Sequence, residues 1–128
     1  MNQQTDELAS LSRSAMESAH APYSNFKVGA AVLGASGRVY SGCNVENASY
    51  GLSICAERVA IFKAVSEGEQ EIQAIAIANS TGKPAFPCGA CRQVMAEFAV
   101  DGMEIYLVSD EGVEKHTLAE LLPHAFRL

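Results

Sequence analysis

Two short segments carry most of the chemically reactive side chains: Cys55-Ala56-Glu57-Arg58 and Pro87-Cys88-Gly89-Ala90-Cys91-Arg92-Gln93. Both are expected where a loop enters a helix, and backbone N–H groups with the positive end of the helix dipole stabilise thiolates there. Cys88 and Cys91 are three residues apart, so they face the same side of a first helical turn, and Cys55 on a facing helix would supply a third ligand. Three protein ligands and an open position for water are typical of catalytic zinc.

Glu57 lies two residues after the first of these cysteines. This is too close for comfortable chelation, but it allows a hydrogen bond to a water molecule on the metal. A ligand, one residue and Glu, followed by P-C-x-x-C, is the signature of zinc deaminases. Zinc lowers the pKa of water from 15.7 toward ~7, so Glu57 is predicted to carry protons in a hydrolysis. Three thiolates leave the centre with excess negative charge, which the adjacent Arg58 is expected to offset by hydrogen-bonding the sulfurs.

Two other interpretations of the cysteines remain open at this point. Cys43 could complete a structural site of four cysteines, or Cys88 and Cys91 could form a redox pair. Structural zinc sites usually consist of two close pairs, whereas Cys43 lies 12 residues before Cys55 in a predicted strand. A redox pair would leave Cys55 and Glu57 without a role. We therefore expect catalytic zinc, with Cys43 as a small buried side chain.

Composition limits the class of protein. The 128 residues are 48% hydrophobic and 19% charged, which predicts one globular domain over residues 1–128. The net charge of −6 disfavours a polynucleotide partner, because the phosphate backbone would be repelled. No apolar run approaches the ~18 residues that span a bilayer, and the first ten residues are unlike a secretory signal. We expect a cytoplasmic protein with reduced thiols and no membrane partner.

Hydrophobic periodicity predicts the elements that position these segments. A helix is expected to start at Thr5, as its N-cap, and to end before Pro22. Further helices are expected from about Cys55 to Gly68, over about 88–99 and over 118–122. Strands are expected over residues 27–33, 38–45, 72–78, 103–109 and 113–116.

This order predicts a three-layer α/β/α domain with a mixed five-stranded sheet and helices on both faces. The helices between strands indicate parallel crossovers at the centre, and the short links indicate hairpins at the edges. About four residues join the last two strands, too few for a crossover helix, so these terminal strands must be antiparallel.

Over nearly its whole length the sequence resembles the small cytidine deaminases of the homotetrameric, three-cysteine class. The matching stretches are Ala21-Pro22-Tyr23-Ser24-Asn25-Phe26, Gly42-Cys43-Asn44-Val45-Glu46-Asn47-Ala48, Cys55-Ala56-Glu57-Arg58, Lys63-Ala64-Val65-Ser66-Glu67-Gly68, Pro87-Cys88-Gly89-Ala90-Cys91-Arg92-Gln93 and Leu121-Leu122-Pro123.

The resemblance implies one zinc ion per subunit on the three cysteines and a catalytic role for Glu57. It further implies seven residues that contact the substrate: Phe26, Asn44, Glu46, Ala48, Tyr50, Ala56 and Phe126. Asn44 and Glu46 would hold the ribose hydroxyls, and the backbone N–H of Ala56 would meet the pyrimidine carbonyl. Phe26 would pack beside the nucleoside.

The remaining three implied contacts depend on neighbouring subunits. Ala48 and Tyr50 lie in the loop that, in this family, reaches a neighbouring subunit's site. Phe126 matches an aromatic residue that stacks on the base from another subunit. The resemblance thus implies a homotetramer whose active sites are shared between subunits.

The implied activity is hydrolytic deamination of cytidine and 2′-deoxycytidine to uridine and 2′-deoxyuridine in pyrimidine salvage. The rival on the same scaffold is a deaminase for a cytosine-containing antibiotic nucleoside. The Asn44-x-Glu46 pair favours free ribose hydroxyls and so the ordinary nucleoside. Negative charge and the antiparallel terminal strand disfavour a polynucleotide editor.

Overall fold

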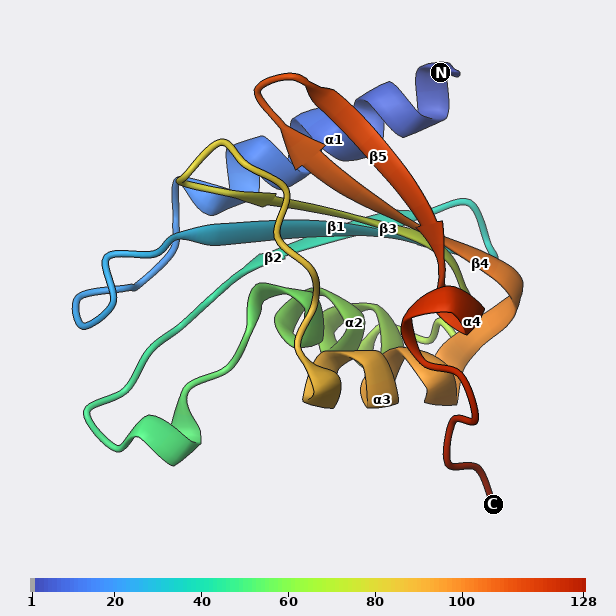
Figure 1. Ribbon diagram of the computed structural model, residues 1–128. Coiled ribbons are helices and arrows are strands. Elements are labelled where there is room, and N and C mark those ends of the chain that lie inside the picture. Colours follow the sequence, from blue (N-terminus) through green and yellow to red (C-terminus); the bar gives the residue numbers. More distant parts are fainter. Residues whose placement is uncertain (1) are drawn as a thin grey trace.

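The computed structural model describes residues 2–128, which form a five-stranded sheet covered by helices on both faces (Figure 1). Helix α1 packs on one face, and α2 and α3 lie together on the other. In chain order the elements are α1 (Gln3–Met16), β1 (Val28–Gly34), β2 (Val39–Cys43), the 3₁₀ helix η1 (Tyr50–Leu52), α2 (Ala56–Ser66), β3 (Ile72–Asn79), α3 (Gly89–Phe98), β4 (Ala99–Ser109), β5 (Gly112–Thr117) and α4 (Leu118–Leu121). Within residues 2–128, no helix combines the length and hydrophobicity needed to cross a bilayer.

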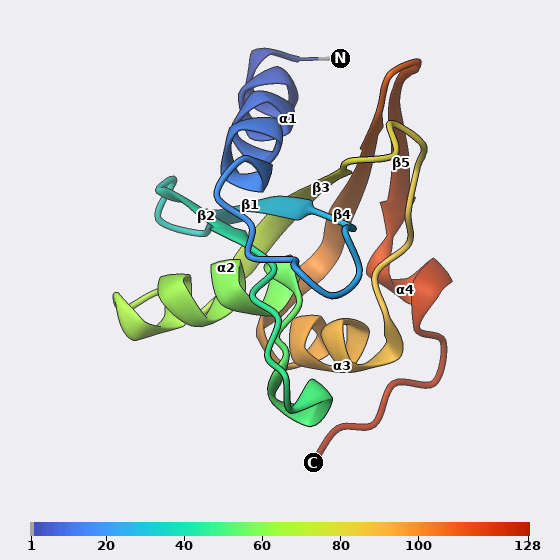
Figure 2. The same ribbon diagram turned by 90° about the vertical axis from the view of Figure 1, so that its left-hand side faces the viewer.

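The strand order is β2-β1-β3-β4-β5. Strand β1 is antiparallel to both β2 and β3, β3 is parallel to β4, and β5 is antiparallel to β4. The expected mixed sheet with antiparallel terminal strands is therefore confirmed. The first crossover is wider than the second, because β1 lies between β2 and β3 whereas β3 and β4 are neighbours. Both crossovers move in the same direction across the sheet, and right-handed connections therefore place α2 and α3 on one face (Figure 2).

Strand β1 is buried on both sides, which explains its unbroken apolar sequence. Ala30 and Val32 belong to the core under α2 and α3, while Ala31 and Leu33 belong to the core under α1. On the neighbouring strand β2, a Cβ atom at Gly42 would lie 2.6 Å from the backbone nitrogen of Ala60. The missing side chain thus allows α2 to lie directly on β2.

Several boundaries differ from the sequence-based expectation. Asn2, not Thr5, is the N-cap of α1, because its side chain accepts a hydrogen bond from the Thr5 backbone N–H at 2.8 Å. Both residue types cap helices, and the cap three residues upstream adds a further turn. Strand β4 begins at Ala99, directly after α3, rather than at 103, since parallel pairing of Ala99 with Ile72 extends it toward the helix.

The end of β2 also differs, because the strand stops at Cys43 instead of continuing to Val45. The backbone N–H of Asn44 still donates to the Val28 carbonyl, and its side chain adds bonds to the Val28 N–H and the Phe26 carbonyl. Val45 then forms isolated bridges with His20 and Ile54. These bridges hold the chain between β2 and α2 next to the segment that precedes β1.

Candidate metal centre and active site

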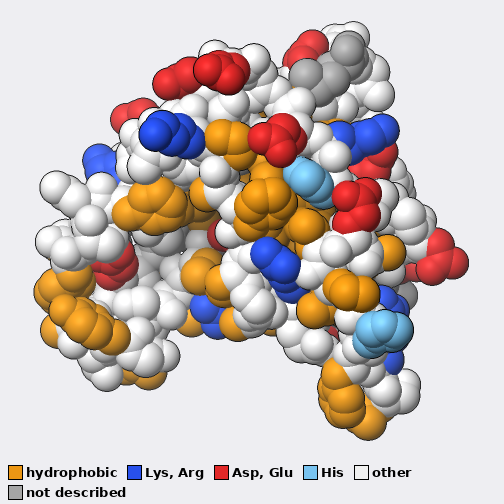
Figure 3. Space-filling model, in the orientation of Figure 1, with side chains coloured by type: hydrophobic (Ala, Val, Ile, Leu, Met, Phe, Trp, Pro, Cys, Tyr) orange, Lys and Arg blue, Asp and Glu red, His pale blue; other side chains and the backbone are white. Residues whose placement is uncertain are grey.

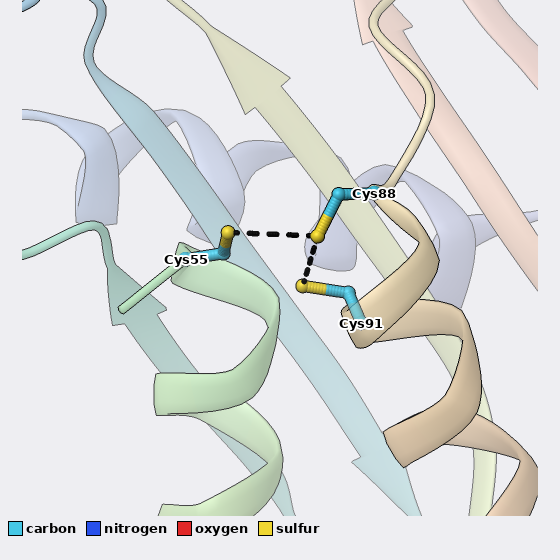
Figure 4. A group of neighbouring side chains, drawn as sticks. All are labelled: Cys55, Cys88 and Cys91. Carbon is cyan, nitrogen blue, oxygen red and sulfur yellow. Dashed lines mark hydrogen bonds between the residues drawn. The ribbon is translucent and has the colours of Figure 1, made fainter. Parts of the chain in front are cut away.

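Three cysteine sulfurs meet where α2 and α3 begin. Cys55 is the N-cap of α2, Cys88 is the N-cap of α3, and Cys91 lies in the first turn of α3. Neither N-cap sulfur makes a capping hydrogen bond to its own helix, and the sulfurs point toward one another (Figure 4). The Sγ atoms of Cys55 and Cys88 are 3.8 Å apart, and those of Cys88 and Cys91 are 3.4 Å apart.

The spacing of these sulfurs fits a single metal ion. All three ligand atoms lie within 4.8 Å of one another. Zn–S bonds of ~2.3 Å in a tetrahedral site put sulfurs about 3.8 Å apart, close to the separations here. Among the residues that the structure describes, Cys43 is not part of this group; it is a free, half-buried cysteine at the end of β2. The geometry therefore favours three ligands and an open position over a structural site of four cysteines.

Arg58 is a cation in contact with the thiol cluster. Its Nη2 atom donates to the Sγ of Cys55 at 3.5 Å. Hydrogen bonds from Cys91 and from Arg58 lower the pKa of Cys55 to about 5, whereas the bond to Cys55 and burial raise the pKa of Cys91. The Arg58 Nε is buried and has no hydrogen-bond partner within residues 2–128. This set of donors is suited to sulfurs that carry negative charge, as metal-bound thiolates do.

Glu57 lies in the first turn of α2 and is almost completely buried, with 5% of its surface exposed. Burial is the main reason that its pKa is raised to about 7, and the negative charge of Cys55 adds to the shift. A carboxyl group with such a pKa can both accept and release a proton near neutral pH. Its burial beside the cluster therefore suits Glu57 to acid–base chemistry at this site.

A cavity of about 330 Å³ opens over the thiols and Glu57. This volume lies at the lower end of the ~300–1,000 Å³ typical of small-molecule sites. Four of the residues implied to contact the substrate line the cavity, together with Glu57, Cys55 and Cys88: Phe26, Asn44, Glu46 and Ala56. The structure thus brings these residues from four separate segments of the chain to one cavity.

Asn44 joins the end of β2 to the start of β1. Its Oδ1 accepts from the Val28 backbone N–H at 2.8 Å, and its Nδ2 donates to the Phe26 carbonyl at 2.8 Å. An amide group has a second N–H and a second lone pair, so one donor and one acceptor remain for a ligand. The two bonds to the backbone fix the directions of the remaining N–H donor and the remaining acceptor lone pair.

Glu46 is held just as firmly. Its carboxylate accepts hydrogen bonds from the backbone N–H groups of Tyr23 and Ser24 and from the Ser24 hydroxyl. The bond from the Ser24 side chain is the largest cause that lowers the pKa of Glu46 below its usual range. Glu46 therefore presents a carboxylate that is favoured in its charged form at the wall of the cavity.

Three of the expected contact residues do not line this cavity: Ala48, Tyr50 and Phe126. Tyr50 is 74% exposed in η1, and its ring packs edge-on against Tyr23 with 5.9 Å between centroids. Phe126 is 69% exposed near the C-terminus, and Ala48 is exposed too. Hydrophobic side chains stand out at the η1 loop and at the C-terminal end in Figure 3. All three are thus exposed side chains that lie outside the cavity over the thiols.

Sequence reasoning missed several lining residues, of which Phe86 is the largest. Phe86, Ser24 and Ser53 all line the cavity. The sequence feature that could have indicated Phe86 is its position two residues before Cys88, in a loop that contains Pro84 and Pro87.

Geometry places the chain among zinc-binding enzymes, with three thiols around an open position beside a buried acid–base group. The family model described as the zinc-binding region of cytidine and deoxycytidylate deaminases matches residues 2–107. The chain belongs to this family.

Relatives named cytidine deaminase match most of the chain. That of Sporosarcina psychrophila is 49% identical over 122 residues, covering 94% of this chain and 90% of its own. That of Halalkalibacterium halodurans is 53% identical over 113 residues, with coverages of 88% and 86%. The crystal structure of cytidine deaminase from Burkholderia pseudomallei superimposes with a TM-score of 0.89 at 46% identity, covering 98% of this chain and 100% of that one. The resemblance, the fold and the zinc-binding character inferred from the sequence are confirmed.

Proposed function

We propose that this protein hydrolyses cytidine and 2′-deoxycytidine to uridine and 2′-deoxyuridine, with release of ammonia. The observation that carries the proposal is the buried Glu57 carboxyl beside three convergent thiols, two of which line the same cavity as Glu57. The names of the relatives from Sporosarcina psychrophila and Halalkalibacterium halodurans support the choice of cytidine. Salvage of pyrimidine nucleosides in the cytoplasm is the role that suits this reaction.

The proton movements follow from the position of Glu57. Zinc held by Cys55, Cys88 and Cys91 would act as a Lewis acid that makes a water molecule acidic enough to attack near neutral pH. Glu57 takes one proton from the attacking water and passes it to N3 of the cytosine ring, where it stays. Glu57 then carries the proton of the new C4 hydroxyl to the amine, which leaves C4 as ammonia. The product is a uracil ring with a C4 carbonyl.

Binding of the nucleoside is assigned to the groups on the other walls. Asn44 and Glu46 hold the ribose hydroxyls, and both already have fixed orientations. The Ala56 backbone N–H lies at the first position of α2, where no intrahelical acceptor exists, so it can meet the pyrimidine carbonyl. Phe26 packs against the nucleoside.

Arg58 is proposed as a positioning residue rather than a catalytic one. Its bond to the Cys55 sulfur offsets the excess charge that three thiolates place on one zinc ion.

The residues 1–128 are proposed to act as one domain within a homotetramer. Ala48, Tyr50 and Phe126 are exposed in the single chain and lie outside its cavity, which suits a role at the site of a neighbouring subunit. Sedimentation of active protein tests the assembly, since an active monomer would contradict shared sites.

The function is tested by following the loss of absorbance at the cytidine band while ammonia is measured in parallel. Turnover that stops with a zinc chelator and returns with added zinc is the expected result. A folded, zinc-loaded protein that leaves cytidine unchanged would overturn the proposal. A modified cytosine nucleoside would then become the candidate substrate.

A further inference from the structure

Phe86 is a cavity-lining aromatic residue to which the proposed mechanism gives no role. It lies in the loop that leads from β3 into α3, separated from Cys88 by Pro87 alone. Its ring packs edge-on against the ring of His116 in β5, with 5.1 Å between centroids and 62° between planes. In Figure 2 this loop descends beside β5 and α4 before it enters α3. A residue next to the metal ligands thus rests on the last strand of the sheet.

His116 is itself fixed from two sides. Its Nε2 lies 3.2 Å from a carboxylate oxygen of Glu114, and its Nδ1 lies 3.5 Å from one of Glu120. Glu120 also forms the capping box of α4 with Thr117. The imidazole plane therefore has little freedom to rotate, and it gives Phe86 a fixed support although Phe86 itself is 52% exposed.

The edges of a pyrimidine ring can be assigned to the walls one by one. N3 must face Glu57, which protonates it, and the C2 carbonyl faces the Ala56 N–H. N1 carries the sugar toward Asn44 and Glu46. C4 lies at the thiol cluster, so the C5–C6 edge is left for the remaining walls. This edge is apolar, and the remaining lining residues that precede α3 are the apolar Ala85 and Phe86.

We propose that Phe86, supported by His116, forms the wall against the C5 edge of the base and excludes C5-substituted cytosines. The inference rests on the proposed function, because the deamination chemistry fixes the orientation of the ring. It adds a specificity-determining residue, Phe86, and a positioning residue, His116, to the site.

The test compares cytidine with 5-methylcytidine on zinc-loaded wild type, Phe86→Ala and Phe86→Leu. The kcat/KM ratio of 5-methylcytidine to cytidine should rise about tenfold or more in Phe86→Ala, and less in Phe86→Leu, because a methyl group then has room. Leu11→Ala is the matched control: Leu11 is 40% exposed on α1, on the opposite face of the sheet, so the ratio should not change. An unchanged ratio in both Phe86 variants, with cytidine turnover retained, would overturn the inference.

Dissociation constants for the two nucleosides, measured by calorimetry, separate this inference from the proposed function. If the wild type binds cytidine without deaminating it, the function fails, while the binding ratio still reports on the Phe86 wall. If neither Phe86 variant changes the binding ratio or the kcat/KM ratio, Phe86 does not form the wall against the C5 edge.

The support from His116 has its own test. His116→Ala should move the kcat/KM ratio in the same direction as Phe86→Ala, by about two- to threefold, with KM for cytidine raised more than kcat is lowered. His116→Phe restores an aromatic edge and should return the ratio toward that of the wild type. A lower melting temperature without any change of the ratio in His116→Ala would contradict the positioning role.

Discussion

Glu57 and Glu46 line the same cavity from two regions of the molecule, and their surroundings shift their pKa values in opposite directions. Glu57, in the first turn of α2, is buried, and its pKa rises to about 7. Glu46, beyond the end of β2, accepts three hydrogen bonds, and its pKa falls. Two carboxylates with separated pKa values divide the roles within a site. The α2 region is suited to moving protons and the β2 region to holding neutral hydroxyl groups.

A third glutamate, Glu69, has a hydrogen-bond pattern like that of Glu46 but lies elsewhere in the molecule. Glu69 accepts from the backbone N–H and the hydroxyl of Ser36, much as Glu46 does from Ser24, and it also accepts from the Tyr40 hydroxyl. In both cases the serine hydroxyl accepts from the backbone N–H two residues later. Glu69 pins the β1–β2 turn and lines none of the cavity over the thiols. Access to that cavity, and not the bonding pattern, therefore distinguishes a binding carboxylate from a structural one.

The largest effect is expected at the α2–α3 end, from Cys91→Ala. Cys91 is fully buried in the cluster, so its loss leaves two thiols and should abolish both stoichiometric zinc and turnover. Zinc content by mass spectrometry and activity are measured together. Cys43→Ala is the matched control, and it should keep one zinc ion per chain and full activity. Loss of zinc from Cys43→Ala would instead support a structural site of four cysteines.

Glu57→Gln should lower kcat by about 10²–10⁴-fold while zinc remains bound, because the amide cannot carry the proton. The substitution preserves shape, and circular dichroism verifies that the fold is retained. Turnover close to the wild-type value would remove Glu57 from the mechanism and with it the division of roles between the two carboxylates.

The parts of the site that depend on local spacing could be predicted from the sequence. Cys88 and Cys91 share one helical turn, and Glu57 and Arg58 follow Cys55 on another. The helical spacing within each turn therefore fixes how these side chains lie relative to one another. The approach of Cys55 to Cys88, 33 residues apart, depends on the crossover topology, which the alternation of helices and strands indicated.

The parts that depend on distant backbone contacts could not be predicted. The Asn44 side chain pairs with the Val28 N–H, 16 residues away, and the Phe86 ring rests on His116 from another strand. Neither contact has a periodic signal. The early start of β4 at Ala99 has the same cause, because it depends on pairing with Ile72. The choice of Asn2 over Thr5 as N-cap is instead a competition between two local signals.

Glu46→Gln tests the binding end. The amide oxygen can still accept from the Tyr23 and Ser24 N–H groups, so the loop should stay in place while the charge is lost. KM for cytidine should rise about 10–100-fold with a smaller change in kcat, because hydrogen bonds to charged groups are the stronger ones. 2′,3′-Dideoxycytidine lacks the two ribose hydroxyls that Glu46 and Asn44 would hold and is therefore the matched substrate. Its KM should change little between the wild type and Glu46→Gln. Equal losses for both nucleosides would make Glu46 only a loop anchor.

Arg58→Ala should weaken zinc binding by about tenfold, in the range known for residues that hold metal ligands. Loss of the bond to the Cys55 sulfur leaves more of the negative charge of the thiolates uncompensated, so the pH–rate profile should shift as well. Competition with a chelator measures the affinity. If affinity and pH profile both stay unchanged, Arg58 has no role at the metal.

The smallest effect on catalysis is expected from Glu69→Gln, which should leave KM and kcat for cytidine unchanged and lower the melting temperature instead. The Ser36 hydroxyl bond is the main cause that lowers the pKa of Glu69 in the folded protein. A depressed pKa stabilises the fold above the unfolded value of ~4.3, and this stability is lost as pH falls through the lower folded value. The melting temperatures of wild type and variant should differ most at neutral pH and converge below pH ~4. A change in KM instead would show that the Ser–Glu turn acts at the site even without access to the cavity, and the comparison with Glu46 would fail.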